Sequence, residues 1–157
     1  MLTYKSRLRV HLGGEEVQVF HFKRGHTDGD SMVFFPRENV LHMGDLFVGL
    51  QFPFIDVDGG GHAGEWVETL DEILRVVPAD ATLIPGHGEI GTVKDLKYFR
   101  DYITELRVQV GKAVKAGKTL QETIDSVRVD KYDRIQPWFR KLENNVGAVY
   151  REFKSGK

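Results

Sequence analysis

The chain has 157 residues, of which 41% are hydrophobic and 29% are charged, and its formal net charge is −1. This length suits a single domain, the composition is that of an ordinary globular protein, and so small a net charge excludes a field that would attract nucleic acid or an anionic membrane. The absence of cysteine excludes disulfides, thiolate metal sites and cysteine nucleophiles, so any metal would be bound by histidine and carboxylate side chains.

No apolar run approaches the roughly 20 residues that cross a membrane. Residues 1–7 have no apolar core and do not form a signal peptide. We therefore expect a cytoplasmic protein without a membrane partner.

The first third of the chain predicts β-strands. Apolar and polar residues alternate over 8–12 and again over 15–22, on either side of Gly13-Gly14, which is typical of a β-hairpin. Residues 31–35 and 40–43 are short apolar runs that predict two buried strands. The segment that follows, 46–62, has no period and predicts a long ordered loop, which is often functional.

The remainder of the chain predicts helices around one further strand. A helix is predicted over 64–77 because its apolar residues fall on one face, and a strand is predicted over 81–84. Thr92-x-x-Asp95 and Thr119-x-x-Glu122 resemble capping boxes, each of which opens a helix. We expect Pro137 to begin a last helix, whose apolar stripe is Phe139, Leu142, Val146, Val149 and Phe153.

This order of elements predicts an α/β (α+β) fold in which helices cover one face of a mixed sheet. We expect one domain over 1–157, with the sheet and its helices in 1–116 and a helical C-terminal extension in 117–157. The strands carry apolar residues on both sides, for example Val19 next to Phe20, so the second face of the sheet should also be buried.

Three segments place a histidine or an aspartate in a glycine-rich loop at the end of a predicted strand: Gly25-His26-Thr27, Met43-Gly44-Asp45 and Pro85-Gly86-His87-Gly88. A strand fixes the backbone, and glycine allows the sharp turn that directs a side chain into a cleft. A turn histidine or a capping aspartate would also explain each segment taken singly. The ordered set favours His26, Asp45 and His87 as metal ligands.

Other polar residues near these loops receive different interpretations. We expect Asp28 and Asp30 to accept hydrogen bonds from loop amides, as Asx residues in glycine turns commonly do. His62 is a further candidate as an accessory ligand or a substrate contact. Phe52 and Phe54 are expected to line the mouth of the cleft, with packing at the edge of the core as the alternative.

In order and context, the three segments resemble the third, fourth and fifth metal motifs of the metallo-β-lactamase superfamily. The first motif of that superfamily, His-x-His-x-Asp-His, does not occur in the chain. The resemblance implies the C-terminal half of an αββα sandwich. It also implies that His26 and His87 bind different metal ions, that Asp45 bridges them and acts in catalysis, and that the metal is Zn²⁺, with Fe²⁺ or Mn²⁺ as alternatives.

The resemblance implies a metal-dependent hydrolase of an unidentified small molecule, with an incomplete metal site. Completion would require a missing N-terminal half, another chain, or a homodimer formed through the exposed sheet face. The isolated chain would be weakly active or inactive. Residues 117–120 and Tyr132-Asp133 also resemble the helical tail of one subgroup of these hydrolases. The alternative is a non-catalytic interaction module that retains the motifs by descent, so the sequence leaves open whether the chain is an enzyme.

Overall fold

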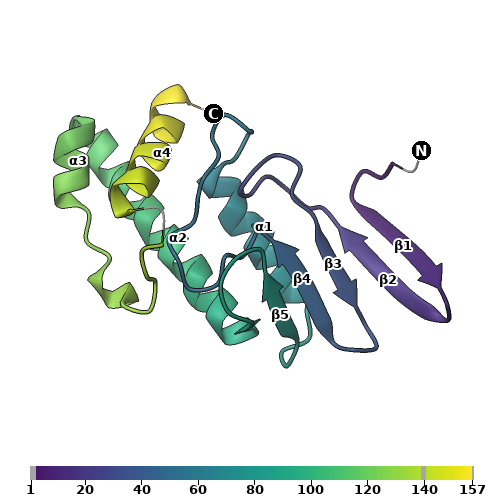
Figure 1. Ribbon diagram of the computed structural model, residues 1–157. Coiled ribbons are helices and arrows are strands. Elements are labelled where there is room, and N and C mark those ends of the chain that lie inside the picture. Colours follow the sequence, from purple (N-terminus) through teal and green to yellow (C-terminus); the bar gives the residue numbers. More distant parts are fainter. Residues whose placement is uncertain (1–2, 139–140, 157) are drawn as a thin grey trace.

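The computed structural model describes residues 3–138 and 141–156. Their strands form one sheet in which the spatial order follows the order along the chain (Figure 1). All neighbouring strands are antiparallel except β4 and β5, which are parallel because helix α1 connects them. The strands are β1 (Arg7–Leu12), β2 (Glu15–Phe20), β3 (Met32–Phe35), β4 (Val40–Gly44), β5 (Thr82–Pro85) and β6 (Gly91–Thr92).

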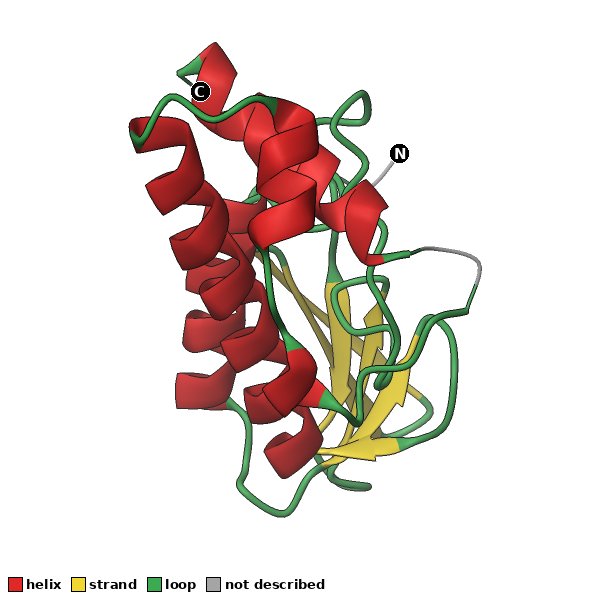
Figure 2. Cartoon of the chain, turned by 90° about the vertical axis from the view of Figure 1, so that its left-hand side faces the viewer, coloured by secondary structure: helices red, strands yellow, loops and turns green. Residues whose placement is uncertain are grey.

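Helices cover one side of this sheet (Figure 2). They are α1 (Ala63–Val76), α2 (Val93–Lys115), α3 (Leu120–Ser126) and α4 (Leu142–Ser155), with a short 3₁₀ turn at Asp130–Tyr132. No helix in the described part of the chain combines the length and apolar character that crossing a bilayer requires. Fully buried apolar side chains of α1 and α2 belong to the same core as those of β4 and β5: Trp66, Leu70, Ile73, Leu96, Phe99, Ile103, Leu41, Met43 and Leu83.

The strand register explains why the sheet is apolar on both faces. Phe20 lies opposite Met32, and Phe34 opposite Leu41, on the face that packs against the helices. The alternate residues point to the opposite face, where none of the described helices lies, and they are only partly buried or exposed: Leu8, Val10, Val17, Val19, Val33, Phe35, Val40 and Ile84. The expected mixed sheet with helices on one face is therefore confirmed.

Both predicted capping boxes are present. The Thr92 side chain accepts from the Asp95 amide while the Asp95 carboxylate accepts from the Thr92 amide, and Thr119 and Glu122 repeat the arrangement. These reciprocal bonds satisfy amides that a helix start would otherwise leave without partners.

The predicted start of the last helix is wrong. Helix α4 begins at Leu142 with Lys141 as its N-cap, and Phe139 lies outside the described residues. Gln136, directly before Pro137, forms a β-bridge instead, because its amide donates to the Leu50 carbonyl and its carbonyl accepts from the Phe52 amide.

Candidate metal centre

The three candidate ligands lie at one edge of the sheet. His26 is in the loop between β2 and β3, Asp45 follows β4, and His87 follows β5. Because β4 and β5 are parallel, their carboxyl ends open at the same edge. His26 Nε2 lies 3.4 Å from Asp45 Oδ2, and His87 Nε2 lies 3.5 Å from Asp45 Oδ1. The expected convergence of these side chains is present, and their role as metal ligands stays a prediction.

Two glycines leave the room that this arrangement needs. A Cβ atom on Gly86 would lie 2.0 Å from Asp45 Oδ1, and one on Gly61 would lie 2.2 Å from the His26 carbonyl oxygen. Any other residue at either position would displace the loop that carries a candidate ligand. Glycine is therefore required at both positions by the close approach of Asp45 and of the His26 backbone.

The imidazole of His26 is held in a fixed orientation. Its Nδ1 lies 2.7 Å from the Phe54 carbonyl oxygen, which can only accept, so Nδ1 carries the proton. In the neutral ring the lone pair is then on Nε2, the atom that faces Asp45. A metal-binding histidine commonly has its second nitrogen fixed in this way. The rings of Phe54 and Trp66 flank the imidazole at 5.6 Å and 6.3 Å between centroids.

His87 is the more accessible of the two histidines, with 45% of its side chain exposed compared with 16% for His26. Its ring lies 4.8 Å from that of Trp138, which sequence reasoning missed. Trp138 closely follows Gln136, whose bridge to Gln51 brings this distant segment to the centre. No pattern around Trp138 signalled this contact.

These side chains line a small cleft of about 120 Å³ at the centre. Aromatic residues form much of its wall, and the expected place of Phe52 and Phe54 at the cleft is confirmed. Trp138 adds a third aromatic ring. The cleft therefore combines imidazole and carboxylate groups with an apolar wall, as small-molecule sites commonly do.

The side chains of His26, Asp45 and His87 are of types that bind a divalent metal, but they do not form a complete set of ligands around one ion. Two imidazoles and a carboxylate are ligands that Zn²⁺ accepts. In the described residues, however, no group of three or more histidine, cysteine, aspartate or glutamate side chains is arranged to hold a metal ion. Each imidazole faces a different oxygen of Asp45. Asp45 therefore lies between the two imidazoles, with one carboxylate oxygen toward each.

Helix α4 supports the loop that orients His26. The fully buried Asn145 donates from Nδ2 to the Pro53 carbonyl at 2.7 Å, and its Oδ1 accepts from the Tyr102 hydroxyl at 3.1 Å. Pro53 directly precedes Phe54, whose carbonyl fixes the His26 ring. The sequence signal for this role is a polar residue next to the apolar stripe of the last helix, which the sequence interpretation did not use.

A second buried polar residue of α4 holds the start of α1. The Glu152 carboxylate accepts from the amides of Ala63 and Gly64 at 2.7 Å and 3.3 Å. His62 Nε2 lies 3.6 Å from the same carboxylate, while His62 Nδ1 accepts from the Glu65 amide. His62 therefore caps α1 and is not among the residues that line the cleft. The expectation of an accessory ligand is replaced by this capping role.

The loop that carries His26 is also fixed by polar contacts of its own. Asp30 accepts from the Thr27 amide and hydroxyl at 2.8 Å and 2.9 Å, which confirms the expected role of this aspartate. Arg24 bonds to Glu65 of α1, and this hydrogen bond lowers the pKa of the Glu65 carboxyl to about 2. The two contacts hold the chain on either side of His26.

No protein-family model matches the chain. Curated relatives are the type 2 metallo-β-lactamase of Bacteroides fragilis, 24% identical over 102 residues, and metallo-β-lactamase IND-1 of Chryseobacterium indologenes, 30% identical over 78 residues. These matches cover 65% and 50% of the chain, and 41% and 33% of the relatives. The chain therefore spans about two fifths or less of the curated relatives that it matches.

Solved structures share the fold to different extents. The stereoselective inverting sec-alkylsulfatase Pisa1 from Pseudomonas sp. superimposes with a TM-score of 0.77 at 21% identity, over 98% of the chain and 26% of the sulfatase. A metallo-β-lactamase from Pontibacter korlensis superimposes with a TM-score of 0.58 at 20% identity, over 65% of the chain and 47% of that protein. The described sheet and helices thus match part of a metallo-β-lactamase fold.

Proposed function

Because this chain is related to the metallo-β-lactamase superfamily, we propose that it contributes half of the active site of a metal-dependent hydrolase. The observation that carries the proposal is the position of Asp45 between the two imidazoles, although the three residues come from separate loops. His26, Asp45 and His87 are the ligands that this half contributes, and Zn²⁺ is the metal that suits them best, with Fe²⁺ and Mn²⁺ as alternatives.

A divalent ion bound there would lower the pKa of water to about 7 and so supply a nucleophile at neutral pH. The residues of the chain itself orient the reaction. Asp45 accepts a hydrogen bond from the attacking water and fixes its direction, and the Phe54 carbonyl keeps the His26 ring in place. Aromatic side chains along the cleft form an apolar wall beside these groups.

The substrate class that we favour is a sulfate ester of an apolar alcohol. The sec-alkylsulfatase match extends over 98% of the chain, whereas matches to β-lactamase structures extend over 56% to 66%. Near-complete coverage includes α3 and α4, the helical tail whose Asn145 supports the loop before His26. The apolar wall of Phe52, Phe54 and Trp138 also suits an alkyl group.

The remaining ligands must come from elsewhere, because the chain contains no His-x-His-x-Asp-His motif. One route is a polypeptide that supplies the N-terminal half of the sandwich, and another is a second copy that binds through the uncovered face of the sheet. Apolar residues on that face, such as Val19 and Val33, favour a covering partner. Light scattering separates the routes, since a mass that stays near 17.9 kDa at all concentrations rules out self-association.

The second candidate function is a non-catalytic interaction module that keeps the motifs by descent. One observation favours it, namely that no complete set of metal-binding side chains is gathered in the described residues. Metal analysis separates the two candidates. Zinc uptake that depends on the candidate ligands supports the hydrolase half, and no uptake after supplementation supports the module.

Replacing His87 by alanine is expected to lower the zinc retained by the purified chain about tenfold or more, because one of few ligands is lost. The unfolding midpoint in urea should change little, since 45% of this side chain is exposed and contributes little packing. Atomic absorption after dialysis measures the zinc content, and circular dichroism follows unfolding.

His11→Ala is the matched control for this experiment. His11 is also an exposed histidine, but it lies on β1 beside Glu16 and away from the cleft. The control should retain the zinc of the parent chain. If His87→Ala binds zinc as well as the parent does, His87 is not a ligand, and if the variant unfolds, its role is structural.

A further inference from the structure

A second cavity lies on the helix-facing side of the sheet, under the end of α1, and shares no lining residue with the metal-centre cleft. Its volume is about 200 Å³. Buried or partly buried apolar side chains form its floor, among them Met32, Phe34 and Leu41, and Val76 and Val77 form the opposite wall. The interior of the cavity is therefore apolar.

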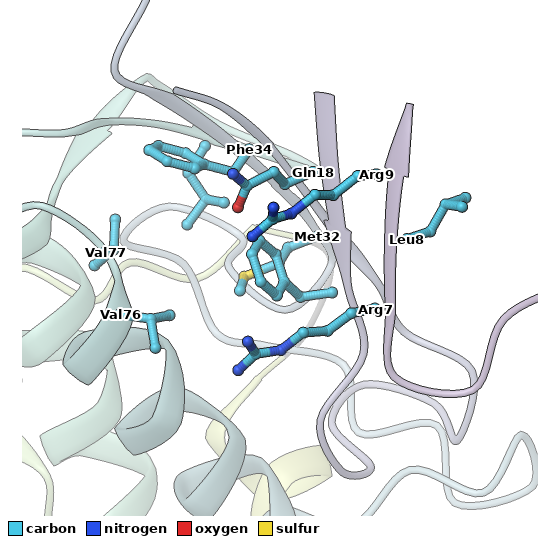
Figure 3. A pocket seen from close by; sticks show the side chains of 10 residues that line it. Arg7, Leu8, Arg9, Gln18, Met32, Phe34, Val76 and Val77 are labelled. Carbon is cyan, nitrogen blue, oxygen red and sulfur yellow. The ribbon is translucent and has the colours of Figure 1, made fainter. Parts of the chain in front are cut away.

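Two arginine side chains line this cavity. Arg7 and Arg9 are alternate residues of β1, so both side chains lie on the same face as Phe20 and Gln18, their partners in β2. Figure 3 shows both guanidinium groups extending over the apolar floor on either side of Met32, with the Gln18 amide beside Arg9, while Leu8 points away. The Arg7 guanidinium lies over the Phe20 ring, 5.5 Å from its centroid.

Arg7 and Arg9 form no ion pair with a carboxylate in the described residues, and neither do Arg128 and Arg151, whereas six other arginines do. These six are Arg24, Arg37, Arg75, Arg100, Arg107 and Arg134. Glu16, the acidic residue on the same face of β2, instead interacts with His11 and accepts from Gln18. The cavity thus combines an apolar interior with two unpaired positive charges.

We propose that this cavity binds an amphipathic anion, a short alkyl or aromatic group that ends in a carboxylate or sulfate. The apolar part would occupy the floor between Met32 and Val77, and the anionic head would accept hydrogen bonds from Arg7 and Arg9, whose planar guanidinium groups suit both head groups. The cavity volume of about 200 Å³ suits a small ligand, for which a medium-chain alkyl carboxylate is a suitable probe.

This inference goes beyond the proposed hydrolase and does not depend on it. The two sites lie on different parts of the sheet, so that a ligand of this cavity need not be a substrate. Experiments with EDTA present remove any contribution from metal at the other centre, and the variant His87→Ala provides a background in which that centre is already disabled.

Isothermal titration of the chain with sodium octanoate tests the proposal. Octanoate and octyl sulfate should each bind saturably at one site, and the ratio of their affinities shows which head group is preferred. Acetate, octanol and octyltrimethylammonium should each bind at least tenfold more weakly, because they lack the tail, the charge or its correct sign.

Variants locate the binding to this cavity. Arg7→Gln combined with Arg9→Gln should weaken octanoate binding at least tenfold, and Val76→Trp should do so separately by filling the cavity from the exposed end of α1. Arg37→Gln is the control, since this arginine already pairs with Glu15 and does not line the cavity. The proposal is overturned if octanoate does not bind saturably, if it binds no better than octyltrimethylammonium, or if both variants bind it as the parent does.

Discussion

Replacing Asp45 by asparagine is expected to lower the zinc affinity of the chain by about a hundredfold or more. Asp45 is the group that both imidazoles face, at 3.4 Å and 3.5 Å, so its charge serves both half-sites at once. The amide of asparagine has nearly the same shape but no charge, and its nitrogen is not a metal ligand. Competition with a chromophoric zinc chelator measures the change.

The same substitution should leave the fold intact, because the shape of the side chain that Gly86 accommodates is preserved. Asp80→Asn is the matched control, as Asp80 is an exposed aspartate in the turn before β5. It should bind zinc like the parent chain. Equal zinc affinity in Asp45→Asn and the parent would remove the basis for the metal centre.

Replacing Asn145 by alanine is expected to lower the free energy of unfolding by about 2–3 kcal/mol. Asn145 and Tyr102 are both fully buried, and truncation leaves the Tyr102 hydroxyl and the Pro53 carbonyl without their partner. Urea denaturation measures the loss. At urea concentrations where the variant is fully folded, its zinc affinity should also fall about tenfold, because the Phe54 carbonyl no longer holds the His26 ring firmly.

A double-mutant cycle with Tyr102→Phe separates the hydrogen bond from the packing. Tyr102→Phe removes the hydroxyl that Asn145→Ala would leave unpaired. The loss of unfolding free energy in the double variant should therefore be smaller than the sum of the losses in the two single variants. The support that we assign to α4 is contradicted if Asn145→Ala costs less than about 0.5 kcal/mol, the usual range of a neutral surface substitution. It is also contradicted if zinc affinity stays at the parent value.

Local signals in the sequence predicted most of the elements. The hairpin follows from alternation around Gly13-Gly14, and the two capping boxes follow from side-chain chemistry that acts over three residues. These predictions are correct because each depends only on residues that are close together in the sequence. The start of α4 was misjudged because the bridge between Gln51 and Gln136, a pairing across more than eighty residues, fixes the backbone before Pro137.

In the candidate site, too, residues in local sequence motifs were predicted, whereas residues placed by long-range packing were not. His26, Asp45 and His87 were selected because each follows a strand in a glycine loop, and the parallel pairing of β4 and β5 brings two of these loops together. Trp138, Asn145 and the pair of arginines on β1 could not be assigned in this way. Their positions depend on the packing of α4 and on which face of the sheet the helices cover, and neither follows from local sequence.

We propose that His26, Asp45 and His87 form half of a metal site. Anomalous scattering at the zinc edge from crystals of the chain soaked in zinc tests it most directly, because millimolar zinc occupies even a weak half-site. We predict an anomalous peak beside the Asp45 carboxylate, about 2.0–2.1 Å from Nε2 of His26 or His87. Peaks confined to other histidines, such as His11 or His42, with none beside Asp45, would contradict the account.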